Sequence, residues 1–593
     1  MREFYSIRRR ALARGVDVSA LTAPGRPRGD AARPASSGMA PRQTGGKVAL
    51  YPGPGATGRA GVPEYMKLLT LEPWRLLCGL LAALTLAGCA SLPEVDRARI
   101  ASTAIGLSAQ TTLGRIASSY RPVEDHSGFR LMPLGTFSLD TRVQLARRAE
   151  VSLDVQYYHL ANDETGRWLL RMLRDAAERG VRVRLLIDDF YTSGEDGLFL
   201  AFAAHKNVEV RIFNPFCCLR ERGQLTRFAF SVGDWGRVNH RMHNKLFVAD
   251  GAMAVIGGRN VANEYFLRSA SENFIDVDAF AVGFVVPPLQ ELFDRYWNSD
   301  AVYPLHSVAR SGRSQTELRA LFEDWTGPEK TPPPPPVPSI DILGYGPIAE
   351  DLDIGRLGLH WGYAYVFADH PDKPFEGKAG GEILETSATY NAFEAIRKAE
   401  RELVLSSPYL VPGKVGMDLF RELRARDVSV TLMTNSLGAT DEPIVHTGYS
   451  DYREPMLALG IDLYEISSSR VKRNRRENLF GASLGRLHAK VAVIDRATIF
   501  VGSMNLDPRS ATINTELGAV IECPPLAREL KRIIDIDRLQ SAYRVRPSAS
   551  GSGLEWLSMN DDMEMILTEE PDSSFFQRFK LWLLRPFVPE SLL

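Results

Sequence analysis

An internal repeat of a short polar motif most constrains how this 593-residue chain can fold. The segment RMHNKLFVADGAMAVIGGRN begins at Arg241, and the segment RLHAKVAVIDRATIFVGSMN begins at Arg486. Both carry the pattern His-x-Lys-x4-Asp, followed at the same distance by Gly-x-x-Asn. One such pattern can arise by chance, but two copies at a shared offset of 245 residues predict two related halves.

Each copy of the motif follows a strand–helix–strand pattern. The strand-like segments alternate in character, and the segments between them place apolar residues at helical spacing. These segments cover 151–160, 165–180 and 181–190 in the first half, and 401–412, 414–427 and 428–436 in the second. Strand–helix–strand order favours parallel strands, so we expect an α/β fold.

The spacing inside the motif places its histidine and lysine on one face of a strand. Residues two apart on a strand point to the same side, so His243 and Lys245 share a face. Asp250 lies an odd number of residues away, and we expect it to be a structural partner within the catalytic set. The glycines that follow allow a tight turn that brings Asn260 back towards the histidine. The second copy supplies His488, Lys490, Asp495 and Asn505.

Together the two copies place two histidines, two lysines and two asparagines in one pocket, and this set suits a phosphodiester. Lysines neutralise the non-bridging oxygens, and asparagine amides stabilise charge that develops in the transition state. One histidine can attack phosphorus while the other protonates the leaving alcohol. No cluster has convincing metal-ligand spacing and this chemistry needs none, so we expect no metal and no cofactor.

The attacking histidine also needs an acceptor on its far ring nitrogen, which fixes the tautomer. Downstream of His488, the stretch NTELGAVI offers Glu516. Downstream of His243, the stretch FIDVDAFAVG offers Asp276, with Asp278 as its rival.

These motifs resemble the phospholipase D superfamily, whose signature is a twice-repeated His-x-Lys-x4-Asp with a following Gly-x-x-Asn. The longer stretches LDVQYYHLANDETGRWLL, RGVRVRLLIDDF and TNSLGATDEPIVHTGY are most similar to bacterial cardiolipin synthases of the C type. The resemblance runs through most of 121–543. It implies two pseudo-twofold-related halves, each a mostly parallel β-sheet flanked by helices, with one active site between them.

The resemblance also implies a reaction and roles for single residues. A phosphatidyl group moves to phosphatidylglycerol through a phosphohistidine, His243 attacks, and His488 acts as acid and then as base. Distance to Gly283 in the family pattern favours Asp276 over Asp278 as the orienting acid. Gly258 stands where the pattern usually has a serine that supports phosphate binding, whereas the second copy keeps Ser503. His370 stands where the subgroup tends to show an acid, and we expect it to lie in a surface loop.

Three other functions are compatible with parts of this pattern. A phospholipase D hydrolase would use water as the acceptor, and the motifs do not separate it from a transferase. A nuclease would use the same residues, but the net charge of −1 lacks the basic surface that nucleic acid favours, so we expect no nucleic-acid partner. A non-catalytic lipid-binding lipoprotein should have lost some of the six pocket residues. We expect phospholipid substrates, with phosphatidylglycerol or phosphatidylethanolamine as donor, and an unidentified protein partner remains open.

The N-terminal region predicts export and lipid anchoring. Residues 1–65 are rich in Arg, Gly, Pro and Ala, so we expect a disordered or untranslated extension. Residues 66–88 have a basic flank and a short apolar run, which is typical of a signal peptide. They end before Cys89 in a sequence that resembles a bacterial lipobox, which implies lipidation of that cysteine. We expect a membrane-associated, periplasm-facing protein of the bacterial envelope, with the outer membrane favoured over the inner because Ala90 is not aspartate.

The remaining boundaries follow from composition. We expect a tether over 89–120, the two phospholipase D-like halves over 121–310 and 346–543, and a Pro-rich linker over 311–345. Aromatic and basic residues alternate in the C-terminal tail, 544–593. Its last helix is expected either to lie in a membrane interface or to pack on the core.

Overall fold

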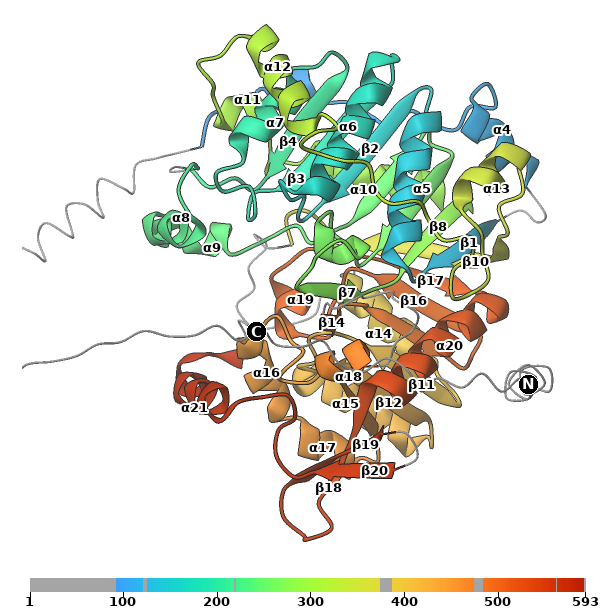
Figure 1. Ribbon diagram of the computed structural model, residues 1–593, viewed down its shortest axis with the longest axis vertical. Helices are drawn as coiled ribbons and strands as arrows, with labels where there is room; N and C mark the ends of the chain where they lie inside the picture. The colour runs from blue at the N-terminus through green and yellow to red at the C-terminus, as the bar shows by residue number, and fades with distance from the viewer. Residues whose placement is uncertain are drawn as a thin grey trace, which may run out of the picture. The chain divides into compact units, whose positions relative to one another are not determined.

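A computed structural model describes residues 92–120, 125–217, 220–373, 387–473, 484–560, 563–590 and 593 (Figure 1). The chain divides into two units at Pro73, and every described residue belongs to the second unit, Trp74–Leu593. The expected extension, signal peptide and lipidated Cys89 lie outside the described residues. None of the described helices is both long and apolar enough to cross a bilayer.

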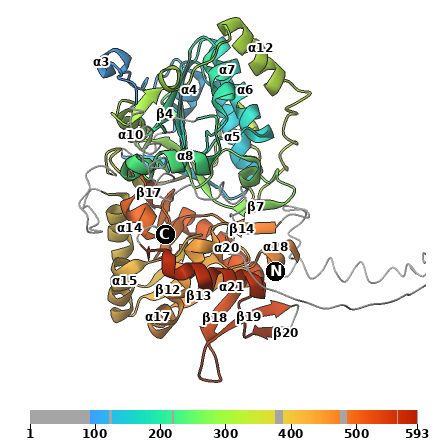
Figure 2. The ribbon, with the colours of Figure 1, turned by 90° about the vertical axis from the view of Figure 1, so that its left-hand side faces the viewer.

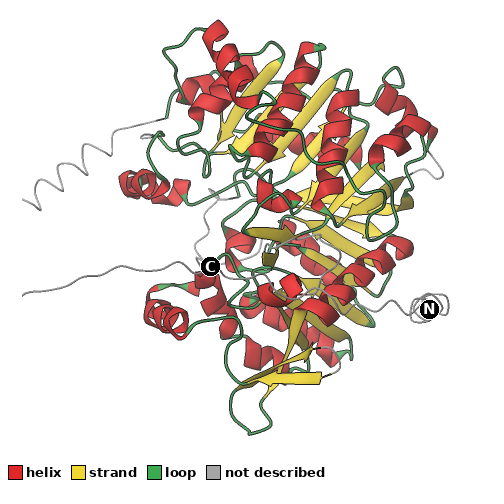
Figure 3. Ribbon diagram, viewed as in Figure 1, coloured by secondary structure: helices red, strands yellow, loops and turns green. Residues whose placement is uncertain are grey.

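One mixed sheet runs through both halves, and eighteen of the described strands belong to it (Figures 1 and 3). In the first half its order is β9 (Val302–Pro304), β4 (Val208–Phe213), β3 (Arg182–Asp188), β2 (Ser152–Tyr157), β5 (Leu246–Ala249), β6 (Met253–Gly257), β8 (Asp278–Gly283) and β1 (His126–Met132). The second half continues with β10 (His360–Ala368), β17 (Leu517–Glu522), β16 (Thr498–Gly502), β15 (Val491–Ile494), β11 (Glu402–Ser406), β12 (Ser429–Asn435), β13 (Asp462–Ile466), β18 (Ala542–Pro547), β19 (Leu554–Asn560) and β20 (Met563–Leu567). The two halves have the same strand order: the eight strands from β9 to β1 correspond to the eight from β18 to β10. The halves meet where β1 pairs antiparallel with β10.

The α/β fold with two related halves is confirmed, but the expectation of a mostly parallel sheet in each half is wrong. Within this sheet, parallel pairing is confined to β2–β3–β4 and to β11–β12–β13. The other pairs of the sheet are antiparallel, and the short turn between β5 and β6 can join only antiparallel neighbours. The halves therefore share one sheet across β1 and β10 instead of having one each.

The predicted strand–helix–strand units are confirmed in both halves. Helix α6 (Glu164–Glu178) connects β2 to β3, and Asp163 caps it by accepting a hydrogen bond from the backbone N–H of Gly166. Its buried face includes Leu169 and Leu173, whose spacing matches one side of a helix. Helix α15 (Gly413–Ala425) connects β11 to β12 in the same way.

Helices surround the sheet in both halves (Figure 3). Those of the first half and the linker are α3 (Arg97–Ile100), α4 (Thr112–Ser119), α5 (Gly135–Arg148), α7 (Asp196–Ala203), α8 (Gln224–Phe230), η2 (Val232–Asp234), α9 (Trp235–Val238), η3 (Asn263–Phe266), α10 (Val286–Trp297), α11 (Leu305–Val308), α12 (Gln315–Thr326) and α13 (Ile348–Ile354). Those of the second half are α14 (Ala388–Arg397), α16 (Pro443–Ser450), α17 (Arg453–Ala458), α18 (Ser468–Arg473), α19 (Pro508–Thr512), α20 (Pro524–Ser541), α21 (Phe575–Leu584) and η4 (Arg585–Phe587). A separate parallel pair, β7 (Glu272–Ile275) with β14 (Leu484–Leu487), joins the halves.

Two of the expected segments contain ordered structure that composition did not indicate. The linker carries α12, whose Phe322 packs on Phe202 of the first half with ring centroids 5.6 Å apart. Strand β18 pairs with β13 and extends past residue 543, so the sheet of the second half continues into the expected tail. His370 lies in an exposed loop after β10, as expected.

Candidate active site

Backbone hydrogen bonds across the two halves hold both histidine segments. His243 precedes β5, and its backbone N–H donates to the carbonyl of Thr515 over 2.8 Å. His488 follows β14, and its backbone N–H donates to the carbonyl of Ile275 over 2.7 Å. Thr515 and Ile275 are the residues directly before the two candidate orienting acids. Each histidine is therefore fixed beside an acid of the other half.

The histidine–acid pairs are crossed between the halves. His243 Nδ1 lies 2.9 Å from Glu516 Oε2, and His488 Nδ1 lies 2.7 Å from Asp276 Oδ2. Both carboxylates are fully buried. Each acid lies downstream of the histidine of its own half in the sequence, but the structure pairs it with the histidine of the other half. The physical reason is the cross-half pairing, which brings the carboxylate of one half to the ring of the other.

Burial governs the protonation of this centre. It raises the pKa of Glu516 to about 7, against the opposing charge of Lys245, and it also raises the pKa of Asp276. Burial, with the nearby lysines, holds the pKa of His243 and of His488 well below the usual histidine value. Both imidazoles are therefore neutral at pH 7 before substrate binds. A proton on Nδ1, held by the acid, leaves Nε2 as the base.

The two lysines occupy matching positions. Nζ of Lys245 donates to the carbonyl of His243, and Nζ of Lys490 donates to the carbonyl of His488, each over 2.6 Å. Burial lowers the pKa of Lys490 to about 8 and that of Lys245 well below its usual value. An anionic ligand would favour the charged form of both.

The asparagines add buried amides to the centre. Asn260 Nδ2 donates to the hydroxyl of Tyr265 over 3.0 Å, and that hydroxyl lies 3.5 Å from His488 Nε2. The side-chain oxygens of Asn260 and Asn505 are buried, and neither has a hydrogen-bond partner among the described residues. Buried polar atoms usually find a partner, so these atoms fit a site that receives a polar ligand.

The motif aspartates lie away from the histidines and have a structural role. The carboxylate of Asp250 accepts hydrogen bonds from the backbone N–H groups of Glu150, Val151 and Ser152. Asp495 accepts the equivalent bonds from residues 400–402 at the start of β11. Each aspartate adopts positive φ in the turn after its strand, a conformation that Asp tolerates better than most residues. They fix the hairpin that carries the histidine.

Gly258 and Ser503 lie against the orienting acids, and their expected support of phosphate binding stays a prediction. The hydroxyl of Ser503 donates to Glu516 and is fully buried. At Gly258, an added Cβ would lie 2.4 Å from Oδ1 of Asp276. Ser503 therefore holds the longer side chain of Glu516, and the shorter side chain of Asp276 occupies the space that a side chain at position 258 would fill.

Several residues of the centre were not found from the sequence. Tyr158 packs edge-on against the ring of His243, with centroids 5.0 Å apart. Asp369 accepts a hydrogen bond from the backbone N–H of Glu516 over 2.8 Å. Arg259, the variable residue of the first Gly-x-x-Asn, donates to the carbonyl of Asp276. Tyr158 lies inside an expected strand and Arg259 lies inside the first motif, whereas Asp369 follows β10, a strand that the sequence did not indicate.

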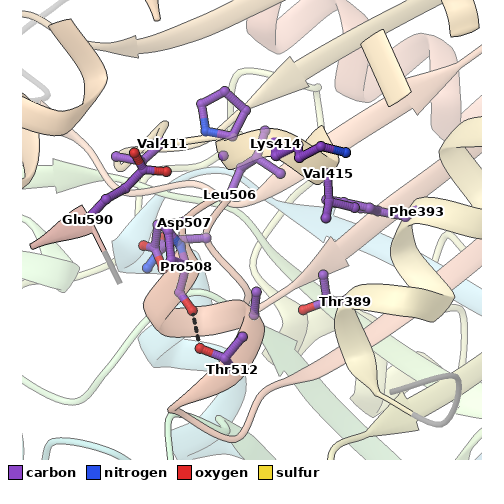
Figure 4. A pocket seen from close by; sticks show the side chains of 14 residues that line it. Thr389, Phe393, Val411, Lys414, Val415, Leu506, Asp507, Pro508, Thr512 and Glu590 are labelled. Carbon is purple, nitrogen blue, oxygen red and sulfur yellow. Dashed lines mark hydrogen bonds between the residues drawn. The ribbon is translucent and has the colours of Figure 1, made fainter. Parts of the chain in front are cut away.

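A pocket of about 280 Å³ adjoins Asn505 (Figure 4). Phe393, Val411 and Leu506 line its apolar part, and Asp507 and Glu590 add carboxylates. Burial raises the pKa of Asp507 to about 7. This mixture of apolar and polar walls suits an amphipathic molecule.

Comparisons with known proteins agree with this geometry. A family described as "Cardiolipin synthase, PLD-like domain" matches residues 143–297 and 393–538. Cardiolipin synthase C of Escherichia coli is 35% identical over 489 residues, which cover 81% of this chain and 100% of that protein. An uncharacterized protein of Helicobacter pylori is 30% identical, over 84% of this chain and 95% of its own length. The crystal structure of phosphatidylserine synthase from Haemophilus influenzae matches 81% of this chain and 100% of that chain, with a TM-score of 0.50 and 12% identity, which shows a likeness of fold alone.

Proposed function

Since the chain belongs to the cardiolipin synthase family of phospholipase D-like proteins, we propose that it transfers a phosphatidyl group to phosphatidylglycerol and so forms cardiolipin. The observation that carries this proposal is the pair of buried histidines, each held at Nδ1 by a carboxylate of the other half. Two lysines lie beside them. This arrangement offers one neutral nucleophile, one proton carrier and two cations for a phosphodiester.

In the first step, Nε2 of His243 attacks the phosphorus of the donor lipid. A phosphorus–nitrogen bond forms, and the bond from phosphorus to the head-group oxygen breaks. His488 Nε2 gives a proton to the departing oxygen. His488 is neutral before binding, but the negative charge of the phosphodiester raises its pKa and favours the protonated form. Lys245 and Lys490 balance the charge on the non-bridging oxygens.

In the second step, neutral His488 removes a proton from a hydroxyl of phosphatidylglycerol. The resulting oxygen attacks phosphorus, the phosphorus–nitrogen bond breaks, and His243 is restored. Assignment of His488 as the proton carrier is supported by the hydroxyl of Tyr265, 3.5 Å from its Nε2. With phosphatidylglycerol as donor the released alcohol is glycerol, and with phosphatidylethanolamine it is ethanolamine.

Hydrolysis is the alternative outcome of the same intermediate. Water would then replace the lipid hydroxyl, and the product would be phosphatidic acid. His243 is 8% exposed and His488 is 4% exposed, so bulk water reaches the reacting nitrogens poorly. This burial favours transfer over hydrolysis.

The same proposal includes the location of the protein. The basic and apolar segment before Cys89 supports export and lipidation of that cysteine. The protein would then face the periplasm from the envelope membrane that contains its substrates. Globomycin, which blocks lipoprotein signal cleavage, should cause a larger, unprocessed form to accumulate; an unchanged form would contradict this location.

Expression in cells that lack other cardiolipin synthases tests the function. Wild-type protein should restore cardiolipin in a lipid mass spectrum, and His243→Ala should not. Phosphatidic acid in place of cardiolipin would move the assignment to a hydrolase. Identical lipid profiles for the two proteins would contradict the proposal.

A further inference from the structure

Helix α21 and the α8–α9 segment both expose large apolar side chains. On α21 and the turn after it, Phe575, Phe576, Trp582 and Phe587 are 67% to 79% exposed. In the α8–α9 segment, Leu225 is 87% exposed, and Phe230 and Trp235 are nearly half exposed. A soluble protein rarely leaves so many large apolar groups clustered in water without a partner for them.

The α8–α9 segment is linked to the candidate nucleophile, His243, through packed aromatic side chains. Trp235 packs on Phe228, and Phe228 packs on Phe190, with ring centroids 5.6 Å and 5.7 Å apart. Phe190 stacks with Tyr158, which packs edge-on against His243. A continuous row of aromatic rings therefore runs from the exposed segment to the reacting histidine.

Helix α21 connects to the other half of the site. The chain that follows it returns to the pocket beside Asn505, where Glu590 forms part of the wall. Farther along, the carbonyl of Leu593 accepts a hydrogen bond from the backbone N–H of Arg509, over 2.8 Å. Both exposed elements are thus attached to the walls of the catalytic centre, one in each half.

The two elements lie on one face of the described structure. Both project from the left-hand side of Figure 1, and both α8 and α21 face the viewer in Figure 2. Between Phe575 and Arg585 the charged residues are Arg578, Lys580 and Arg585. Arg578 pairs with Glu569 and Arg585 pairs with Asp451, whereas Lys580 forms no ion pair with a described residue. A short helix with exposed aromatic rings, one lysine that is unpaired among the described residues and two partly exposed arginines matches the interface of an anionic bilayer.

We propose that α21 and the α8–α9 segment form one docking surface that places the catalytic centre on an anionic phospholipid bilayer. The inference rests on the proposed function, whose substrates lie in such a bilayer. Aromatic rings and basic side chains together fit the bilayer interface better than they fit a protein surface, because rings enter the head-group region while cations meet lipid phosphates.

The test compares two substrate forms with the full chain. One is a short-chain phosphatidylglycerol below its micellar concentration, and the other is a vesicle of long-chain phosphatidylglycerol. The double variant Phe576→Ser/Trp582→Ser should lower the ratio of vesicle to monomer activity about tenfold. Leu225→Ser/Trp235→Ser should also lower it. Ile354→Ser is the matched control, since Ile354 is 66% exposed on α13, away from this face, and the ratio should not change.

A physical measurement accompanies the kinetics. Brominated phosphatidylglycerol vesicles should quench part of the wild-type tryptophan fluorescence. Trp582→Phe should lose the share that comes from Trp582, and the share from Trp235 should remain. Replacing phosphatidylglycerol with zwitterionic phosphatidylcholine should weaken the quenching. The difference in quenching between wild type and Trp582→Phe reports on a single side chain and does not depend on the N-terminal region.

The outcomes separate the two proposals. If wild-type protein converts neither substrate form, the proposed function fails. If it converts both, the activity ratios match the control and Trp582 is not quenched, the docking surface is refuted while the function stands. If wild-type protein sediments as a dimer and the α21 variant as a monomer, the occupant is a second copy of the chain and the membrane proposal is overturned.

Discussion

Replacement of Glu516 by glutamine tests the crossed histidine–acid pairs. In the first step His243 becomes positively charged, and the carboxylate lies 2.9 Å from its Nδ1. Two unit charges about 4 Å apart attract by about 4 kcal/mol at an effective dielectric constant of about 20. The glutamine amide still accepts a hydrogen bond, worth about 1 kcal/mol. The net loss of about 3 kcal/mol predicts a fall in rate of about a hundredfold.

The assay is the burst of p-nitrophenol from phosphatidyl-p-nitrophenol, a substrate whose leaving group needs no proton. Glu516→Gln should keep its full defect in this burst, because Glu516 serves the nucleophile. Asp276→Asn should show a much smaller defect here than with phosphatidylglycerol, because Asp276 serves the proton carrier. If each acid served the histidine of its own half, the two variants would exchange behaviour, and that result would refute the crossed assignment.

Stability controls separate this effect from unfolding. Burial raises the folded-state pKa of Glu516 above its unfolded value, so the stability contributed by this group is greatest at low pH and is lost as pH rises through about 7. Glutamine carries no charge to bury, so the melting temperature of Glu516→Gln at pH 8 should not fall. Glu522→Gln, at an exposed position at the end of β17, the strand that directly follows Glu516, should change neither rate nor stability.

Three further predictions follow from the same geometry. The pH–rate profile should be bell-shaped, with the rate rising near pH 7 as Glu516 ionises and falling above about pH 8 as Lys490 loses its proton. Glu516→Gln should remove the rise on the acidic side, and a rise that remains in this variant would contradict the assignment to Glu516. Gly258→Ala should reduce the rate with phosphatidylglycerol more than tenfold, because the added Cβ would meet the carboxylate of Asp276; near-normal activity would show that the carboxylate can move at little cost. Asp250→Asn should lower the free energy of unfolding by about 2 kcal/mol in urea, since its carboxylate accepts several backbone bonds, while the rate of the folded protein stays within about threefold; a large loss of rate without a loss of stability would contradict its structural role.

The histidine and lysine of each motif were expected on one face of a strand, but they lie directly before β5 and before β15. The repeat and the strand periods were sufficient to predict the strand–helix–strand units. Those features depend on spacing along one strand or helix. The same spacing correctly separated Asp250 from the face that carries His243. Local pattern therefore predicted the elements of the strand–helix–strand units, but not α12 or the extent of β18.

The crossed pairs and the shared sheet could not be predicted in this way. They depend on contacts between His243 and the residues around Glu516, which lie 273 positions apart. The sequence offers both acids at similar distances from the histidines and does not indicate which half supplies the partner. The role of Gly258 likewise depends on the position of Asp276 in space and not on its distance along the chain.

Trapping the covalent intermediate tests the central claim most directly. His488→Ala, given phosphatidyl-p-nitrophenol, should complete the first step and stall before the second, because no base activates the acceptor. Rapid quenching, digestion and mass spectrometry should then find the phosphatidyl adduct on the peptide that contains His243. An adduct on another peptide, or a burst of p-nitrophenol with no adduct at all, would contradict a transfer that proceeds through His243.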